Sequence, residues 1–404
     1  MKQALSKSVS KVRSAVLRKK TLLVLGIFLS TFLLALFLSE IPNAGSQAER
    51  VYIDQLSWKA IFENPLQAPH KILTLTTTMV SSSVRASRIV SLLFLLLTAT
   101  ALYYALRHWH EPRTAALATL AFATNSVTLG IARLGLPLIT IMSFFVFAGL
   151  LLWHMHSNSN KFLPFITLVS LGALLYVPGF LWFMIIIGSV YLTKIKEFFV
   201  NVKRSAILLG IVCGLLLVTP LFMSFLRDIN NLTTWLLLPA EFNAAETVRN
   251  VLRVPSAFLY RMPVESSINA GRLPVFDIAS GILFLLGAQA YIRKIKLDRT
   301  RIMLGSALVA TLAGALGQTL LAVTLLLPFV FCVVAAGIEY LFDEWMRVFP
   351  RNPVARSFGV IIMTACVMFS MYYQLSRFLI VWPQTPETRQ TYDQARIIEP
   401  KVAR

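Results

Sequence analysis

Long apolar runs alternate with short polar segments along most of the chain. The first run is Thr21–Leu38, and ten later runs approach the roughly 20 residues that a helix needs to cross a bilayer. These ten lie at residues 89–106, 114–132, 136–153, 162–177, 179–193, 205–226, 276–292, 302–316, 319–341 and 357–380. The pattern predicts an all-α, polytopic transmembrane helix bundle of about 11 spans, counting a helix on each side of Pro178-Gly179.

Two polar segments, residues 40–88 and 227–275, are much longer than the others. In the first, apolar residues recur at helical spacing from Val51 to Phe62, which predicts a short amphipathic helix in the membrane interface. Thr234–Leu238 and Val248–Tyr260 predict similar helices in the second. Because loops on a rigid scaffold carry much of a protein's function, we expect the site there.

The composition excludes a water-soluble domain, a disordered chain and a disulfide scaffold. Of the 404 residues, 57% are hydrophobic and 14% are charged, and the mean hydropathy is +0.71. A soluble domain has about 25% charged residues. The three cysteines, Cys213, Cys332 and Cys366, lie inside apolar runs without metal-ligand spacing, so we expect them to be packing residues.

The net charge of +20 could indicate a nucleic-acid partner, but its distribution favours a membrane topology. Placing the N-terminus in the cytoplasm puts 22 of the 38 Lys and Arg residues inside and 12 of the 18 acids outside. Both long loops are then outside. The predicted organisation is a basic cytoplasmic segment 1–20, a transmembrane domain 21–380 and an outer tail 381–404, with no nucleic-acid binding.

Motifs for nucleotide binding, zinc proteolysis or serine hydrolysis are absent from the sequence. His108/His110 and His154/His156 are spaced two apart and so do not share a helix face, which predicts interfacial solvation and no metal site. His70, in the first outer loop, is a possible substrate contact, as is Tyr52.

Charged residues of the outer segments supply the candidate chemistry. Glu49 opens the first interfacial helix, where it is either a general base or an acid favoured by the helix dipole. Asp54 is the second candidate base. Arginines that the positive-inside rule does not explain are Arg85, Arg88, Arg133, Arg261 and Arg272. They either bind a phosphate or form ion pairs and reach toward lipid headgroups.

The order of these residues resembles that of the GT-C superfamily of polytopic glycosyltransferases, especially bacterial members of the protein-mannosyltransferase-like family 39. The resemblance covers roughly residues 20–195 and, more loosely, 270–380. The segments that carry it are Ser46–Glu49, Arg88–Ser91, Tyr103–Trp109, Arg113–Ala118, Ala132–Gly135 and Tyr176–Gly179. Two departures are Arg50, where the family often has a second acid, and Ala68-Pro69-His70-Lys71, where it has a His-Pro-Pro-like element.

The resemblance implies transfer of a sugar from a polyprenyl-phosphate-linked donor to an acceptor protein, lipid or glycan, with inversion, at a bacterial cytoplasmic membrane. Glu49, or else Asp54, is implied as the base. Arg88, Arg133 and Arg272, with Arg261 and Arg85 behind them, are implied at the donor phosphate. No cofactor is required, although a divalent metal is compatible with the family. The alternatives are a transporter or flippase of a lipid or polar solute, and a catalytically degenerate scaffold.

Overall fold

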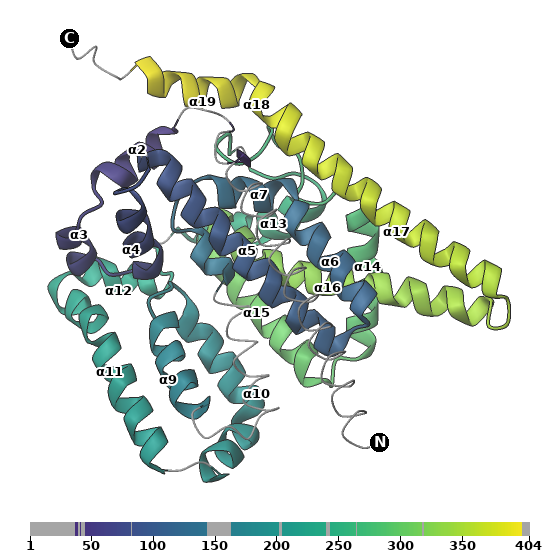
Figure 1. Cartoon of the computed structure of the whole chain (residues 1–404), viewed down its shortest axis with the longest axis horizontal. Coiled ribbons are helices and arrows are strands. Elements are labelled where there is room, and N and C mark those ends of the chain that lie inside the picture. Colours follow the sequence, from purple (N-terminus) through teal and green to yellow (C-terminus); the bar gives the residue numbers. More distant parts are fainter. Residues whose placement is uncertain are drawn as a thin grey trace, which may run out of the picture.

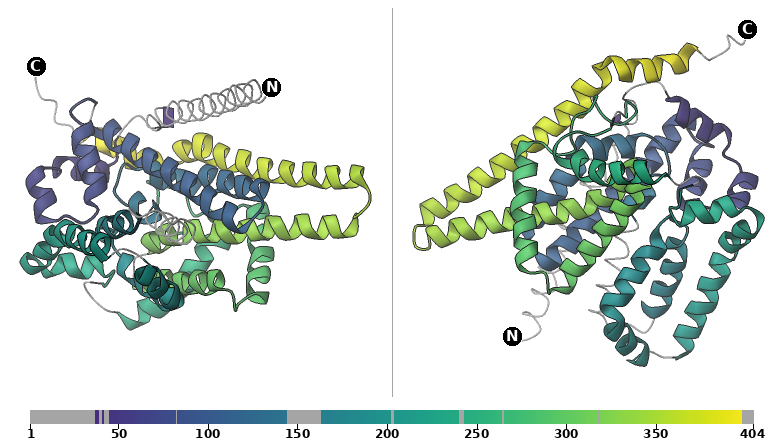
Figure 2. Two further views of the ribbon diagram at one scale, coloured as in Figure 1. Left: turned by 60° about the horizontal axis from the view of Figure 1, so that its bottom comes forward. Right: turned by 180° about the vertical axis from the view of Figure 1, so that it is seen from behind.

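The computed structural model describes residues 37–38, 41, 45–81, 83–143, 163–201, 204–239, 243–263, 265–316 and 319–397. Within these ranges the chain is helical and contains no β-strand, which confirms the predicted all-α class. Figure 1 shows the helices gathered around α16, with α9, α10 and α11 as a group to one side. The hairpin of α16 and α17 extends away from the other side, as both views of Figure 2 show.

Four described helices are long and apolar enough to cross a membrane, and five if one bent pair counts as a single span. They belong to α5 (Ser83–Trp109), α11 (Arg204–Arg227), α16 (Thr319–Val348) and α17 (Pro353–Ser376). These helices indicate a membrane protein.

The bent pair is α6 (Pro112–Thr124) and α7 (Ser126–Arg133), and the chain bends by 56° between their axes. The sequence pattern predicted one continuous span there. The break falls at Asn125, whose side chain accepts hydrogen bonds from the Val127 and Thr128 amides and so starts a new helix.

The remaining predicted spans correspond to shorter helices or lie outside the described residues. α9 (Leu163–Leu174), α10 (Phe180–Asn201), α14 (Ile278–Arg293) and α15 (Asp298–Ala315) match four predicted runs. Nearly all of the run 21–38 and much of 136–153 lie outside the described residues. The total of about 11 spans therefore stays a prediction.

Close helix crossings between small residues hold the bundle together. At the crossing of α14 and α16, a Cβ on Gly287 would lie 1.9 Å from the Val333 carbonyl oxygen, and one on Gly337 equally close to that of Leu283. The two backbones can touch only because both residues are glycine. Most of α16 is buried by its neighbours, which makes it the central helix of the core.

The first long loop folds into three short helices, α2 (Gln47–Asp54), α3 (Trp58–Glu63) and α4 (Ala68–Thr77). The single helix predicted from Val51 to Phe62 is therefore wrong. Ser57 interrupts it, because its side chain caps α3 by accepting from the Ala60 amide. Pro69 lies in the first turn of α4, where its missing N–H costs no hydrogen bond.

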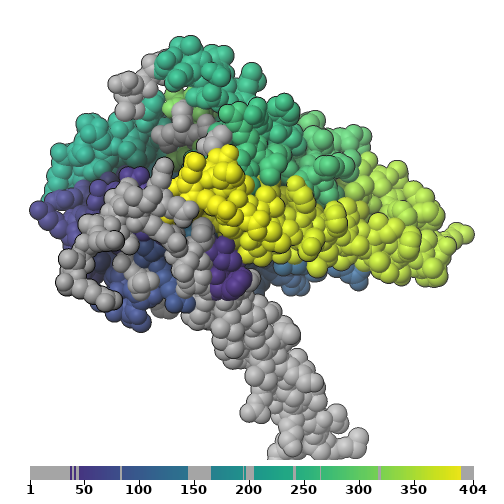
Figure 3. Space-filling view, turned by 90° about the horizontal axis from the view of Figure 1, so that it is seen from above, coloured from purple at the N-terminus to yellow at the C-terminus, as the bar shows by residue number. Residues whose placement is uncertain are grey.

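The second long loop contains α12 (Ile229–Trp235) and α13 (Ala244–Leu259). α13 covers most of the helix predicted at Val248–Tyr260, whereas the helix predicted at Thr234–Leu238 is misplaced, because α12 already ends at Trp235. After α17 the chain continues through η1 (Arg377–Val381) and α18 (Trp382–Gln384), and α19 (Pro386–Ile397) follows after a bend at Thr385. The segment predicted as an outer tail is thus largely a helix. In Figure 3 this C-terminal segment lies across the face that also carries the second loop.

Candidate functional site

Glu49 lies at the N-terminus of α2 and is fully buried. Its Oε2 accepts a hydrogen bond of 2.7 Å from the Ser46 amide, while the Ser46 hydroxyl accepts from the Glu49 amide at 3.3 Å. This reciprocal capping box orients the carboxylate away from solvent and satisfies two amides that the helix start leaves open. The sequence therefore places Glu49 through local capping chemistry.

Arg88 meets Glu49 from the beginning of α5, and its side chain is only 2% exposed. Its Nε donates to Oε1 at 2.7 Å and its Nη2 donates to Oε2 at 3.0 Å. This is a two-point pairing of guanidinium and carboxylate, in which both bonds are charge-assisted. It joins the first outer loop to the predicted second span.

Arg133, at the end of α7, is the third member. Its Nη1 lies 3.9 Å from Oε2 of Glu49 and donates a hydrogen bond to the Tyr392 hydroxyl. The guanidinium carbon also lies 4.7 Å from the centre of the Tyr392 ring and 5.4 Å from that of Trp382. One buried carboxylate thus faces two buried guanidinium groups; we call Glu49, Arg88 and Arg133 the ionic cluster.

The turn after α7 brings Arg133 beside Arg88. Gly135 has a φ of +66°, and a Cβ there would lie 2.6 Å from the Ser87 hydroxyl and 3.3 Å from the Arg88 amide nitrogen. Only glycine combines that backbone conformation with so close an approach. Gly135 therefore fixes how α7 and α5 meet at the ionic cluster.

The C-terminal segment closes the ionic cluster on one side, and the sequence analysis missed this. Trp382 donates from its indole nitrogen to the Ser266 carbonyl at 3.0 Å, and the Tyr392 hydroxyl donates to the Ser267 carbonyl at 3.2 Å. Burial raises the pKa of Tyr392 to about 12, so its hydroxyl keeps its proton at neutral pH. Tyr392 and Trp382 are adjacent to Arg133 in space but about 250 residues away in sequence, without a local motif.

A second polar group lies next to the ionic cluster, one helical turn along both α2 and α5. His70, buried on α4, contacts the Tyr52 hydroxyl at 3.1 Å through Nδ1 and the Ser91 hydroxyl at 2.7 Å through Nε2. Burial lowers the pKa of His70 to about 3, so the imidazole is neutral at physiological pH. The Ser91 hydroxyl can in turn donate to the Leu136 carbonyl, 3.4 Å away.

Protonation of His70 at Nε2 satisfies this chain of bonds, with Tyr52 as the donor to Nδ1. Burial raises the pKa of Tyr52, which keeps that donor protonated. His70 and Tyr52, predicted as possible substrate contacts, thus hold α2, α4 and α5 together beside the ionic cluster.

Arg377 fastens the second long loop, and the sequence analysis did not single it out. Its guanidinium donates to the Pro274 carbonyl at 2.6 Å, the Leu273 carbonyl at 3.0 Å and the Asn269 side-chain oxygen at 2.6 Å. Asn269 also donates to the Leu273 carbonyl at 2.8 Å, which tightens the same turn. An arginine inside a predicted span was the available signal.

Four predicted site residues lie outside the ionic cluster, with exposed side chains: Asp54, Arg85, Arg261 and Arg272. Asp54 follows Glu49 by five residues, which places it on a different face of α2. Arg261 and Arg272 belong to the loop that Arg377 fastens, where the Met262 amide donates to the Arg272 carbonyl at 3.2 Å. The cluster therefore contains two of the five predicted phosphate-binding arginines.

The described residues contain no group of three or more His, Cys, Asp or Glu side chains that could hold a metal ion. His110, expected to be solvated at the interface, is instead buried and forms a hydrogen bond with Glu339 of α16 through Nδ1. The solvation prediction is thus wrong for His110, because α16 brings a carboxylate to it.

The ionic cluster combines a carboxylate that can accept a proton with two guanidinium groups that can hold a phosphate. In this conformation Arg88 donates to both oxygens of Glu49, Arg133 lies within ion-pair distance of one of them, and the Tyr392 hydroxyl accepts a hydrogen bond from Arg133. No protein-family model matches the chain, and no curated protein matches it either.

Proposed function

We propose that the protein is a membrane glycosyltransferase that moves a sugar from a polyprenyl-phosphate-linked donor to an acceptor on the outer face of a bacterial cytoplasmic membrane. The observation that carries the proposal is the convergence of Glu49, Arg88 and Arg133 from three separate elements on one buried cluster. These are the residues to which the family resemblance assigns the base and the phosphate contacts. The acceptor is a protein, lipid or glycan of the cell envelope.

The two arginines are suited to the donor. Guanidinium groups bind phosphate oxygens in pairs, and their charge stabilises the negative charge that develops as the sugar–phosphate bond breaks. A donor phosphate entering between Arg88 and Arg133 competes with the bonds that these side chains make to Glu49 and to Tyr392. Binding of the donor would thereby release the Glu49 carboxylate.

The released carboxylate is suited to the acceptor. It takes the proton from the acceptor nucleophile as the nucleophile attacks the anomeric carbon, and the sugar–oxygen bond to phosphate breaks on the opposite side. The polyprenyl phosphate leaves with the bonding electrons, and the anomeric centre is inverted. Because the leaving group is already phosphorylated, this step requires no nucleotide.

The test is transfer of radiolabelled sugar by the full-length protein in liposomes. Polyprenyl-phosphate-linked sugars are offered together with an extract of cell-envelope lipids and proteins. We expect label to reach a new acceptor, with at least about a hundredfold lower rate for Glu49→Gln. Lys59→Ala, an exposed change on α3, serves as the control that keeps the wild-type rate. Rates are compared per folded molecule, below the melting temperature of each variant.

Asp54→Asn separates the two candidate bases. If Glu49→Gln keeps the wild-type rate while Asp54→Asn abolishes it, Asp54 is the base and the role assigned to the ionic cluster is wrong. Arg88→Lys keeps a charge but loses the two-point fork, so we expect weaker donor binding. Unchanged donor affinity in this variant would remove Arg88 from the phosphate site.

A catalytically inactive scaffold is the second candidate, favoured by one specific observation. Both oxygens of Glu49 accept bonds within the protein, and the carboxylate has no solvent exposure. A cluster kept only for stability would have this arrangement. Folded wild-type protein that transfers no sugar from any donor offered supports the scaffold.

A further inference from the structure

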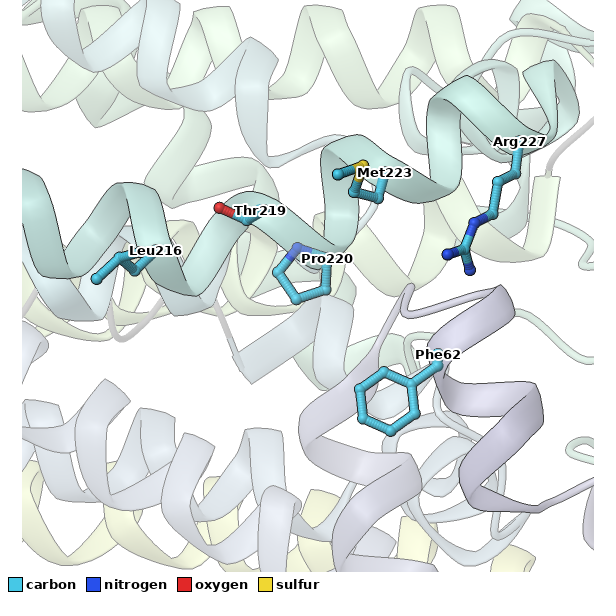
Figure 4. Close-up of a pocket in the computed structure, with 6 residues that line it drawn as sticks. All are labelled: Phe62, Leu216, Thr219, Pro220, Met223 and Arg227. Atoms are coloured by element: carbon cyan, nitrogen blue, oxygen red, sulfur yellow. The ribbon is translucent and has the colours of Figure 1, made fainter.

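An apolar groove lies between α3 and α11, away from the ionic cluster. Its volume is about 500 Å³, and its walls consist of Phe62 on α3 and five residues of α11. The α11 residues are Leu216, Thr219, Pro220, Met223 and Arg227. Figure 4 shows them along one side of α11, with Phe62 facing them and Arg227 at the end that lies next to α3.

The groove has the length of one leaflet. Leu216, Pro220, Met223 and Arg227 follow at spacings of four, three and four, so they form one stripe of the helix. At 1.5 Å per residue, the stripe from Leu216 to Arg227 is about 16 Å long. This is about half of the roughly 30 Å hydrocarbon core of a bilayer.

The walls are apolar along this length. The hydroxyl of Thr219 donates to the Leu215 carbonyl within α11 at 2.9 Å, so this bond does not need a partner in the groove. Phe62 is 63% exposed, and Trp58, one turn earlier on α3, is 48% exposed. Exposed aromatic side chains on a short amphipathic helix are typical of the headgroup level of a membrane. The groove thus extends from that level into the hydrocarbon.

The headgroup end carries a cation. Arg227 is exposed in the last turn of α11. Two acids directly follow lining residues in sequence, and both have bonds of their own: Glu63, after Phe62, pairs with Lys59 at 3.8 Å, and Asp228, after Arg227, accepts from the Asn230 amide at 2.9 Å. A guanidinium above an apolar groove complements a phosphate above a hydrocarbon chain.

We propose that this groove binds one diacyl phospholipid of the surrounding bilayer, with its phosphate on Arg227 and one acyl chain between Phe62 and α11. The lipid seals the seam between the first-loop helices and the group of α9, α10 and α11. None of the residues of the ionic cluster lines the groove, so the proposal does not depend on the glycosyltransferase activity.

Native mass spectrometry of the full-length protein, released from detergent with increasing phosphatidylglycerol, tests the proposal. We expect a first lipid to bind about fivefold more weakly to Arg227→Ala than to wild type, the effect of roughly one basic residue at a membrane surface. Arg227→Lys restores most of that affinity. Arg204→Ala is the matched control, since it removes an exposed arginine from the opposite end of the same helix.

Two further arms test the phosphate and the acyl chain separately. Diacylglycerol lacks the phosphate, so we expect wild type and Arg227→Ala to bind it with equal affinity. We also expect wild type to bind diacylglycerol more weakly than phosphatidylglycerol. Met223→Trp fills the groove, so it weakens both lipids. Because Arg227 and Met223 are exposed, gel filtration of these variants should match wild type.

Three results would overturn the proposal. The first is equal phosphatidylglycerol affinity for Arg227→Ala and Arg204→Ala, which would show that Arg227 does not bind the lipid phosphate. The second is unchanged binding of both lipids by Met223→Trp, which would show that no acyl chain lies in the groove. The third is displacement of the first phosphatidylglycerol by an equimolar amount of polyprenyl phosphate, which assigns the groove to that lipid instead.

Discussion

The ionic cluster makes Glu49 important for stability as well as for the proposed chemistry. Glu49→Gln keeps an acceptor oxygen for the Ser46 amide but removes the charge that balances Arg88 and Arg133. Leaving buried charges unpaired costs about 3–5 kcal/mol. We expect a melting temperature several degrees below wild type in detergent, followed by tryptophan fluorescence, while Asp54→Asn melts like wild type. Equal melting of the Glu49 variant and wild type would show that the cluster is not charge-balanced as described.

His70 gives the molecule a specific dependence on pH. Its pKa is about 3 when folded, against an ordinary value of 6.5, because burial disfavours the charged ring. Below pH 6.5 the unfolded chain binds a proton that the folded chain does not, so stability falls as the pH decreases toward 3. At pH 4.5 this loss amounts to about 3 kcal/mol.

We therefore expect the stability gap between wild type and His70→Asn to narrow by about this amount from pH 7.5 to pH 4.5. Other titrating groups act on both proteins and cancel in the difference. The measurement is thermal or denaturant unfolding of both proteins across that range. Parallel curves for the two proteins would contradict the assignment of a neutral, buried His70.

Single residues were predictable from the sequence where local chemistry fixes them. Glu49 follows from its place at a helix start, and Arg88 and Arg133 from being arginines on the predicted outer face. The sequence could not separate these two from Arg85, Arg261 and Arg272, because tertiary packing decides which side chain is buried. Tyr392 was missed because its contact with Arg133 forms between segments far apart in the chain.

Among the structural elements, the turn after α7 determines how the ionic cluster is assembled. Gly135→Ala places a methyl group 2.6 Å from the Ser87 hydroxyl in a backbone conformation with φ of +66°. Gly271 provides a matched control, since its φ is +56° but a Cβ there meets nothing within 4 Å. Both substitutions incur the left-handed backbone strain of about 1–3 kcal/mol. Only Gly135→Ala also displaces α5 from α7.

We expect Gly135→Ala to melt at a clearly lower temperature than Gly271→Ala, and to combine sub-additively with Glu49→Gln because both disturb the same cluster. A double-mutant cycle of melting temperatures checks this. If the two glycine variants melt alike, or if the effects of Gly135→Ala and Glu49→Gln simply add, the turn does not position the cluster.

Helices formed by long apolar runs were predictable from the sequence, whereas the bounds of the short helices in the loops were harder to predict. The α5, α11 and α17 helices are close to their predicted runs, because hydrophobicity alone specifies such helices. The break at Asn125 and the split at Ser57 were missed, because each depends on one side chain that caps a new helix. A capping residue inside a helical pattern is ambiguous until its hydrogen bonds are known.

For the whole molecule, several side-chain contacts join segments that the sequence predicts on the same side of the membrane. The bonds of the ionic cluster and of Tyr392 join the first loop, the α7 turn, the second loop and the C-terminal segment, all predicted outside. Arg377, near the outer end of the last predicted span, also binds the second loop. The hydrogen bond of His110 with Glu339 joins two positions at predicted inner span ends. Segments predicted on one side of the membrane thus meet one another at one end of the bundle (Figure 1).

This arrangement predicts opposite accessibility for Lys59 and Arg347, whose side chains are 85% and 76% exposed. Each is replaced by cysteine in a background in which Cys213, Cys332 and Cys366 are alanine. In intact cells a membrane-impermeant maleimide should label Lys59→Cys at once and Arg347→Cys only after the membrane is opened. Labelling of both from outside would contradict the positive-inside assignment and, with it, an outer-face site. Because Lys59 and Arg347 do not belong to the ionic cluster and pair with Glu63 and Glu344 instead, this outcome reports orientation independently of whether the protein transfers a sugar.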